Sequence, residues 1–131
     1  MASDAEFFAS QTLYLSINIK PEAWEKMAQL TATRIDPALH DETRFALMAV
    51  LVAGKENFTE LERSFKITSG NLSSHLSKLE RAQYISIRKR FMGKRPQTTI
   101  EATAKGREAF KNYLKAMSAR IEQAQRAIAE A

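Results

Sequence analysis

The chain contains no cysteine, only four glycines and three prolines, and no apolar run of the ~18 residues that a membrane-spanning helix needs. Without cysteine it can form no disulfide, no thiolate zinc site and no cysteine-based redox sensor. None of the glycines has the spacing of a nucleotide-binding loop. The first residues lack the basic start and apolar stretch of a secretion signal. These absences predict a cytoplasmic protein without a membrane segment, and 131 residues suffice for one domain with a core.

The residues that build catalytic and metal sites are equally scarce. His40 and His75 are the only histidines, and a metal site there would have to recruit carboxylates such as Asp36 or Asp41. The sequence has no local signature of a Ser/His/Asp triad. We therefore expect no enzyme, no metal and no cofactor. For His75 we expect a phosphate contact or a role in helix packing.

Acidic residues are rare in the middle of the chain, where basic residues gather. Residues 57–100 contain nine basic and three acidic residues, whereas residues 1–40 and 41–56 each carry more acid than base. The net charge of the whole chain is +5. A positive charge concentrated in one segment is typical of a protein that binds a polyanion. The alternative is a basic patch without a partner.

Leu72, Leu76 and Leu79 have the i, i+4, i+7 spacing of one buried helix stripe. At ~100° per residue, the opposite face carries small polar and basic side chains, namely Asn71, Ser74, Ser77, Lys78 and Arg81. Small polar groups permit close approach to a surface and form hydrogen bonds with base edges or phosphates. We therefore interpret residues 69–82 as a DNA-recognition helix. A serine-rich solvated face is the alternative.

Two helices are predicted immediately before this one. Asp41 is a suitable N-cap for a helix over 42–52, which Gly54 would end. Thr59 and Glu62 have the spacing of a capping box, which predicts a helix over 60–65 with Thr59 as its cap. About three residues then lead to Thr68 or Ser69, the cap of the recognition helix. Two helices joined in this way form a helix-turn-helix.

The hydrophobic period changes to two after Gln83, which predicts a β-hairpin. Apolar and polar residues alternate over 85–91, residues 92–96 form the expected turn, and the return strand covers 98–102. Five of the eight residues from 88 to 95 are basic, and phosphate is the simplest partner for them. The alternative is an edge strand that charge protects from aggregation.

Helices are also predicted towards both ends of the chain. Residues 1–20 fit a helix or a strand, with 4–16 weakly helical, and Pro21 begins a helix in which Trp24 is a core or dimer contact. Thr103 caps a last helix over 104–129. A heptad seam runs along this helix through Phe110, Leu114, Met117, Ile121, Ala124 and Ile128. The helix is too long for so small a domain to cover, which favours pairing with a second chain.

Three stretches of the chain resemble the small winged helix-turn-helix transcriptional regulators near the MarR and ArsR families. They are DPALHDETRFALMAVL, FTELERSFKITSGNLSSHLSKLERAQYI and FMGKRPQTTIEATAKGREAF, and the similarity covers residues 36–115. The segment GNLSSHL in the recognition helix and GKRP in the hairpin, or wing, carry most of the resemblance. Family members often have an acidic residue where Ser69 stands and a glycine where Gln83 stands.

This resemblance implies a homodimer that binds palindromic operator DNA and regulates transcription, with any small-molecule effector unidentified. It implies major-groove contacts by Ser69, Asn71, Ser73, Ser74 and His75, and wing contacts by Lys94 and Arg95. The outer helix face and the basic hairpin add Ser77, Lys78, Arg81, Arg88 and Arg90 as expected DNA contacts. The expected dimer contacts are Trp24, Leu114, Met117, Ile121 and Ile128.

The expected fold is mainly α with a small β-hairpin: an α+β winged helix-turn-helix with extra N-terminal helices and a long C-terminal dimerisation helix. Residues 1–35 are expected to form a helical extension, 36–103 the DNA-binding domain and 104–131 the dimerisation helix, all in one compact unit. The expected function is homodimeric, sequence-specific regulation of transcription on double-stranded DNA. One alternative is a protein–protein interaction module, which would favour an apolar outer helix face and no basic wing. The other is nucleic-acid binding without base readout.

Overall fold

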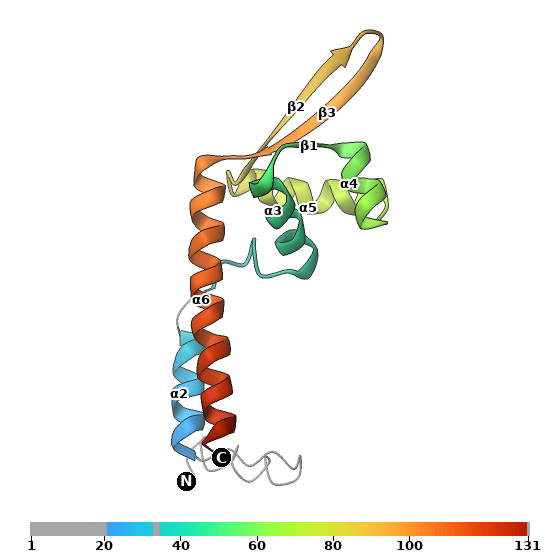
Figure 1. Ribbon diagram of the computed structural model, residues 1–131. Helices are drawn as coiled ribbons and strands as arrows, with labels where there is room; N and C mark the ends of the chain where they lie inside the picture. The colour runs from blue at the N-terminus through green and yellow to red at the C-terminus, as the bar shows by residue number, and fades with distance from the viewer. Residues whose placement is uncertain (1–20, 33–34, 131) are drawn as a thin grey trace. The chain divides into compact units, whose positions relative to one another are not determined.

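The computed structural model describes residues 21–32 and 35–130, so the weak helix expected over 4–16 lies outside the described residues. The elements are α2 (Pro21–Ala32), α3 (Glu42–Ala53), β1 (Glu56–Asn57), α4 (Phe58–Phe65), α5 (Ser69–Arg81), β2 (Ile85–Met92), β3 (Arg95–Ala102) and α6 (Ala104–Ala129). The strands form one antiparallel sheet in the order β1-β3-β2 (Figure 1). This confirms the expected α+β winged helix-turn-helix with a long C-terminal helix. No described helix is both long and apolar enough to cross a bilayer.

The described residues fall into two compact units. One runs from Asp36 to Tyr113 and contains α3, α4, α5, the sheet and the first turns of α6. The other contains α2 and the rest of α6, which lie alongside each other in Figure 1. In this second unit Ala23 and Ala127 are buried.

The leucine stripe of α5 is buried in the core of the first unit. Leu72 and Leu79 have no exposed surface and Leu76 has 2%, as the helical spacing predicted. The helix packs against α3 and against β2. Fully buried side chains from the neighbouring elements are Leu47, Met48 and Leu51 of α3, Leu61 of α4 and Ile100 of β3. Each such burial stabilises the fold by roughly 1.5–3 kcal/mol, so the core holds α5 by its inner face and leaves the outer face open.

The N-terminus of α3 is capped by Asp41, as predicted. Asp41 Oδ1 accepts a hydrogen bond from the backbone N–H of Arg44 at 2.9 Å. This bond, together with the positive charge of the Arg44 side chain, lowers the pKa of the Asp41 carboxyl. The helix ends at Gly54, also as expected, whose N–H donates to Val50 O.

The N-terminus of α4 differs from the capping box predicted at Thr59. The cap is Asn57, whose Oδ1 accepts from the backbone N–H of Glu60 at 2.8 Å. The prediction was wrong because β1 ends at Asn57, where pairing with Thr99 fixes the extended backbone that a cap requires. Glu62 does not reach back to the cap; its carboxylate accepts a hydrogen bond from the Ser69 hydroxyl.

The two ends of α5 are fixed by different devices. Thr68 Oγ1 caps the start by accepting from Asn71 N–H at 3.2 Å. At the end, Gln83 N–H donates to Glu80 O at 2.9 Å and Tyr84 N–H donates to Leu79 O at 3.0 Å. These are the two hydrogen bonds of a Schellman motif. Gln83 therefore occupies the left-handed position, with φ 67°, that glycine usually holds.

The hairpin turn is shorter than the predicted turn over 92–96. The strands pair without interruption from Ile85 with Ala102 to Met92 with Arg95, so only Gly93 and Lys94 lie between them. Gly93 has a φ of 67°, and a positive φ at the first of two loop residues is the type II′ pattern that suits the twist of paired strands. The alternation of side chains could not show that pairing continues this close to the tip.

The start of α6 is joined to the end of α5. Thr103 Oγ1 accepts from Gly106 N–H at 2.9 Å, which confirms Thr103 as the cap. The backbone N–H of Thr103 donates to Tyr84 O, also at 2.9 Å. A Cβ added at Gly106 would lie 2.0 Å from Tyr84 O, so only glycine permits this approach. The recognition helix, the wing and the first turns of α6 are thus tied together at Tyr84.

Candidate DNA-binding surface

The face of α5 opposite the leucine stripe is open to solvent. Its exposed side chains are those of Asn71, Ser73, Ser74, Lys78 and Arg81, and Ser77 is half-buried beside them. Glu80 is the one acidic residue in the helix. Ser69 is also exposed, but its hydroxyl is engaged with Glu62 of α4. The helix therefore presents hydroxyl, amide and cationic groups that suit base edges and phosphates.

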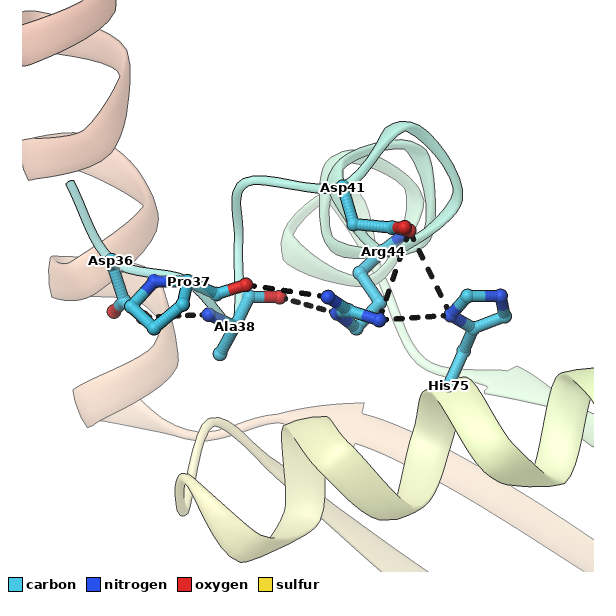
Figure 2. Close-up of polar contacts among 6 residues, drawn as sticks. All are labelled: Asp36, Pro37, Ala38, Asp41, Arg44 and His75. Atoms are coloured by element: carbon cyan, nitrogen blue, oxygen red, sulfur yellow. Dashed lines mark hydrogen bonds and ion pairs between the residues drawn. The ribbon is translucent and has the colours of Figure 1, made fainter.

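His75 is directed away from this face, towards α3 (Figure 2). Its Nδ1 lies 3.2 Å from Nη1 of Arg44 and 3.7 Å from Oδ1 of Asp41. A guanidinium only donates hydrogen bonds, so Nδ1 accepts here and the ring proton lies on Nε2. Among the roles expected for His75, these contacts are those of helix packing.

Arg44 is the centre of this arrangement and is buried, with 9% of its surface exposed. Its Nε donates to Ala38 O at 2.7 Å, and its Nη2 donates to Pro37 O at 3.3 Å. A buried guanidinium requires such partners, because leaving its N–H groups unsatisfied would cost several kcal/mol. Arg44 thereby joins the loop over 36–41 to α3 and, through His75, to the recognition helix.

A second contact anchors the same loop to the end of α5. The Asp36 carboxylate accepts from Ala38 N–H at 3.0 Å and from the Tyr84 hydroxyl. Burial and the Asp36 contact raise the pKa of Tyr84 to about 12, so its hydroxyl stays protonated and donating at neutral pH. The recognition helix is thus held in its middle by Arg44 of α3, through His75, and beyond its end by Asp36 of the loop, through Tyr84.

The wing, residues 85–102, has two faces of different character. Ile85, Ile87 and Lys89 lie on one face of β2. This face begins in the core, because Ile85 is buried, as is Ile100, the residue that pairs with Ile87. Arg88 and Arg90 point to the other face, where they line a shallow groove with Gln97, Thr99 and Glu101. The two arginines named from the sequence therefore lie on the face away from α5, and Lys89 lies towards it.

Lys89 is a candidate contact that the sequence analysis missed. It lines a cleft between the wing and the recognition helix together with Phe58, Ser73, Leu76, Ser77, Ile87 and Thr98. The signal was available, because Lys89 follows Ile85 and Ile87 at the strand period of two. Ser73, Ser77 and Lys89 place polar and cationic groups from two elements along one cleft.

The cations of the wing outnumber its acidic residues, of which Glu101 lines the same groove as Arg88 and Arg90. These cations are Arg88, Lys89, Arg90, Lys94 and Arg95, all exposed. Within the described part of the chain, none of them takes part in an ion pair. Across residues 21–32 and 35–130, no three His, Asp or Glu side chains come together as metal ligands. With five basic residues and one acidic residue, residues 85–102 carry a net charge of +4.

A helix-turn-helix held by its leucine face, a polar outer face and an adjoining basic hairpin together define a winged helix-turn-helix DNA-binding protein. Residues 43–121 match the family described as winged helix DNA-binding domain, and the chain belongs to this family. The chain is 42% identical over 57 residues to an uncharacterized protein of Methanocaldococcus jannaschii. That match covers 44% of this chain and 62% of the relative, less than two thirds of its length.

Solved structures show the same fold. The transcriptional regulator homologue protein from Pyrococcus horikoshii OT3 superposes with a TM-score of 0.62 at 27% identity, over 77% of this chain and 95% of the other. A transcriptional regulator of the MarR family from Enterococcus faecalis V583 superposes with a TM-score of 0.58 at 20% identity, over 68% and 81%. The resemblance to winged-helix regulators is thereby confirmed, and these structural relatives are described as transcriptional regulators.

Proposed function

We propose that this chain is a sequence-specific, double-stranded-DNA-binding transcriptional regulator that acts as a cytoplasmic homodimer and has no catalytic activity. The observation that supports this most is that one compact unit carries both the open polar face of α5 and the five unpaired wing cations. Cations without acidic partners repel one another, and a phosphate backbone relieves that repulsion while releasing its counterions.

The two elements have different roles in this proposal. Asn71, Ser73 and Ser74 meet base edges in the major groove, with Ser69 and Ser77 at the margins of the contact. Lys78 and Arg81, at the C-terminal end of α5, meet phosphates. The wing tip, with Lys94 and Arg95, reaches the adjacent backbone or minor groove, and Arg88, Lys89 and Arg90 add phosphate contacts. His75 serves by positioning α5 through Arg44.

The homodimer is proposed from the exposure of the heptad seam in α6. Leu114 is 40% exposed, Ile121 53% and Ile128 62%, and these residues follow one another at intervals of seven. Met117 and Trp24 are half-buried and complete the proposed contact. A two-fold dimer would present two recognition helices, which is why the proposed operator is palindromic.

The first prediction tests the face of α5. A duplex is first selected from a random-sequence pool by binding to the wild-type protein, and its affinity is then measured by fluorescence anisotropy. Ser74→Glu places a carboxylate against DNA, where like charges cost several kcal/mol, so binding should weaken by at least about a hundredfold. Ser74 is exposed, so the circular dichroism spectrum and melting temperature should stay close to those of the wild type.

The matched control is Ala119→Glu, which adds the same charge to an exposed position of α6. It should bind the selected duplex nearly as well as the wild type. If Ser74→Glu binds as tightly as Ala119→Glu, the outer face of α5 does not meet DNA. If the wild type selects no duplex at all, the DNA-binding function itself is wrong and the protein-interaction alternative replaces it.

A further inference from the structure

Two large apolar side chains lie exposed at the tip of the basic wing. Phe91 is 76% exposed and Met92 is 67% exposed, more than any other large hydrophobic residue whose burial is described. They directly precede the two-residue turn of Gly93 and Lys94. Figure 1 shows this end of the hairpin projecting well beyond α4 and α5. The hairpin is therefore paired up to its last residues, and the described part of the chain leaves most of the surface of both apolar side chains uncovered.

If charge served only to protect an edge strand from aggregation, it would explain the basic residues of the wing but not Phe91 and Met92. Cations on an exposed strand oppose aggregation, whereas an exposed phenylalanine and methionine promote it. Phe91 faces Pro96 in the register, yet this neighbour leaves three quarters of its surface in water. A partner that buries Phe91 and Met92 would explain why two apolar side chains lie exposed at the tip of a charged hairpin.

The direction of Phe91 relates it to the proposed DNA surface. The strand period places Phe91 on the same face as Ile87 and Lys89, which line the cleft beside α5. From the core to the tip, the side of the wing that faces the recognition helix thus carries an apolar residue (Ile87), a cation (Lys89) and an aromatic ring (Phe91). A partner that contacts Lys89 and the outer face of α5 would meet Phe91 next.

We propose that Phe91, with Met92 on the opposite face of the same strand end, is an apolar wedge that enters the minor groove of duplex DNA, partly unstacks one base step and bends the duplex. This inference rests on the proposed function and specifies what the wing does there. Phenylalanine and methionine are among the side chains that proteins insert between base steps, with bends of roughly 20–90°. The exposed cations around the tip, Arg90, Lys94 and Arg95, complement the phosphates on both sides of the groove.

A lipid surface is the rival partner for a basic hairpin with an apolar tip, and the structure favours DNA. Two side chains bury little area in a bilayer, where even a single myristoyl chain gives only marginal anchoring. The same compact unit also presents the polar face of α5, and binding to a membrane would not explain that face. Duplex DNA accounts for both surfaces with one partner.

The experiment uses the selected duplex with 2-aminopurine placed in turn at each adenine of the segments that flank the recognised sequence. The fluorescence of this base rises when it unstacks, and fluorophores on the two ends report bending by energy transfer. Wild-type protein at saturation should raise the 2-aminopurine signal at one step per half-site and shorten the end-to-end distance. Phe91→Ser with Met92→Ser should abolish both changes and weaken binding roughly tenfold or more.

Two further variants separate the wedge from charge and from folding. Phe91→Leu keeps an apolar side chain and should retain both the unstacking and the bend. Lys94→Ala with Arg95→Ala should bind more weakly but still unstack the same step at saturation. All variants are compared with the wild type by circular dichroism, which surface changes at the tip should not alter.

The possible results are distinct. If the wild type binds the duplex without unstacking any step, or if the double serine variant unstacks it equally, the wedge is overturned while DNA binding stands. Binding to phosphatidylglycerol vesicles that requires Phe91 and Met92, without unstacking of the duplex, would overturn the wedge in favour of lipid. If the wild type selects no duplex, the proposed function fails, and the wedge fails with it.

Discussion

Two residues of the helix-turn-helix adopt a backbone conformation that glycine usually occupies. Gln83 and Lys66 both adopt a positive φ without being glycine, and both stand at the C-terminal ends of helices of the helix-turn-helix. A side chain in this region costs roughly 1–2 kcal/mol. Gln83 lies at the junction between the recognition helix and the wing. There the two Schellman hydrogen bonds hold its backbone in the left-handed conformation despite this free-energy cost.

Gln83→Gly should therefore stabilise the protein. Relief of the left-handed strain exceeds the added entropy of glycine in the unfolded chain, so we expect a gain of about 0.5–1 kcal/mol and a melting temperature a few degrees higher. The hydrogen bond from Lys105 Nζ to Gln83 Oε1 would be lost, but both side chains are exposed, so its contribution is small. Differential scanning calorimetry measures the change.

The matched control is Gln123→Gly, the same substitution inside α6, where glycine costs a helix about 1 kcal/mol. The two variants should move the melting temperature in opposite directions. A lower melting temperature for Gln83→Gly would show that contacts of the glutamine side chain outweigh the backbone strain.

For single residues, the sequence did not allow contacts between positions far apart in the chain to be predicted. Arg44 and His75 lie on different helices, and no local pattern indicated that their side chains meet. The cap of α4 was missed for a related reason, since Asn57 and Thr59 are both good caps and only pairing of β1 with β3 selects the first. Periodicity identifies a face of an element, but it does not identify the partner.

Whole elements were predicted more successfully than single contacts. The stripe of Leu72, Leu76 and Leu79 and the caps Asp41, Thr68 and Thr103 act within one or two turns of helix, so local sequence determines them. The length of the hairpin turn was wrong because it depends on strand register, which local alternation does not fix. The same alternation, followed one step further, would have assigned Lys89 to the face of α5.

The wing as an element makes a prediction about salt. Lys94→Ala with Arg95→Ala removes two cations per chain, or four in the proposed dimer. Each neutralised phosphate contributes a slope of about −0.9 to log K against log salt, so the slope should become shallower by up to about 3.6. Affinities for the selected duplex and for unrelated duplexes should fall together, because phosphate contacts carry no sequence information. Anisotropy titrations at several salt concentrations measure both.

The control for this pair is Lys111→Ala with Lys115→Ala, which removes equal charge from exposed positions of α6. Its slope should match that of the wild type. An unchanged slope in the wing variant would remove Lys94 and Arg95 from the DNA interface. A loss of discrimination between duplexes at constant slope would instead make them readers of base sequence.

At the scale of the whole molecule, the prediction concerns assembly. Ile121 is 53% exposed in the middle of the α6 seam, and Ile121→Glu would place a charge in the proposed dimer contact. Sedimentation equilibrium should show association weakened by at least about tenfold, since burying an unpaired charge costs several kcal/mol. Ala119→Glu, on the opposite side of the same helix, should associate like the wild type. Equal association of the two variants would show that the seam does not form the dimer.

The pairing of β1 with β3 has a consequence for how the chain folds during synthesis. Glu56 pairs with Ile100, so the sheet is completed only after α4, α5 and the whole hairpin have left the ribosome. At 5–20 residues per second, the first helices wait several seconds for that strand. The exposed seam residues of α6 follow the unit from Asp36 to Tyr113 in the chain, so they are synthesised after all of its residues. The part of the proposed dimer contact that α6 supplies therefore leaves the ribosome after every residue of the DNA-binding unit.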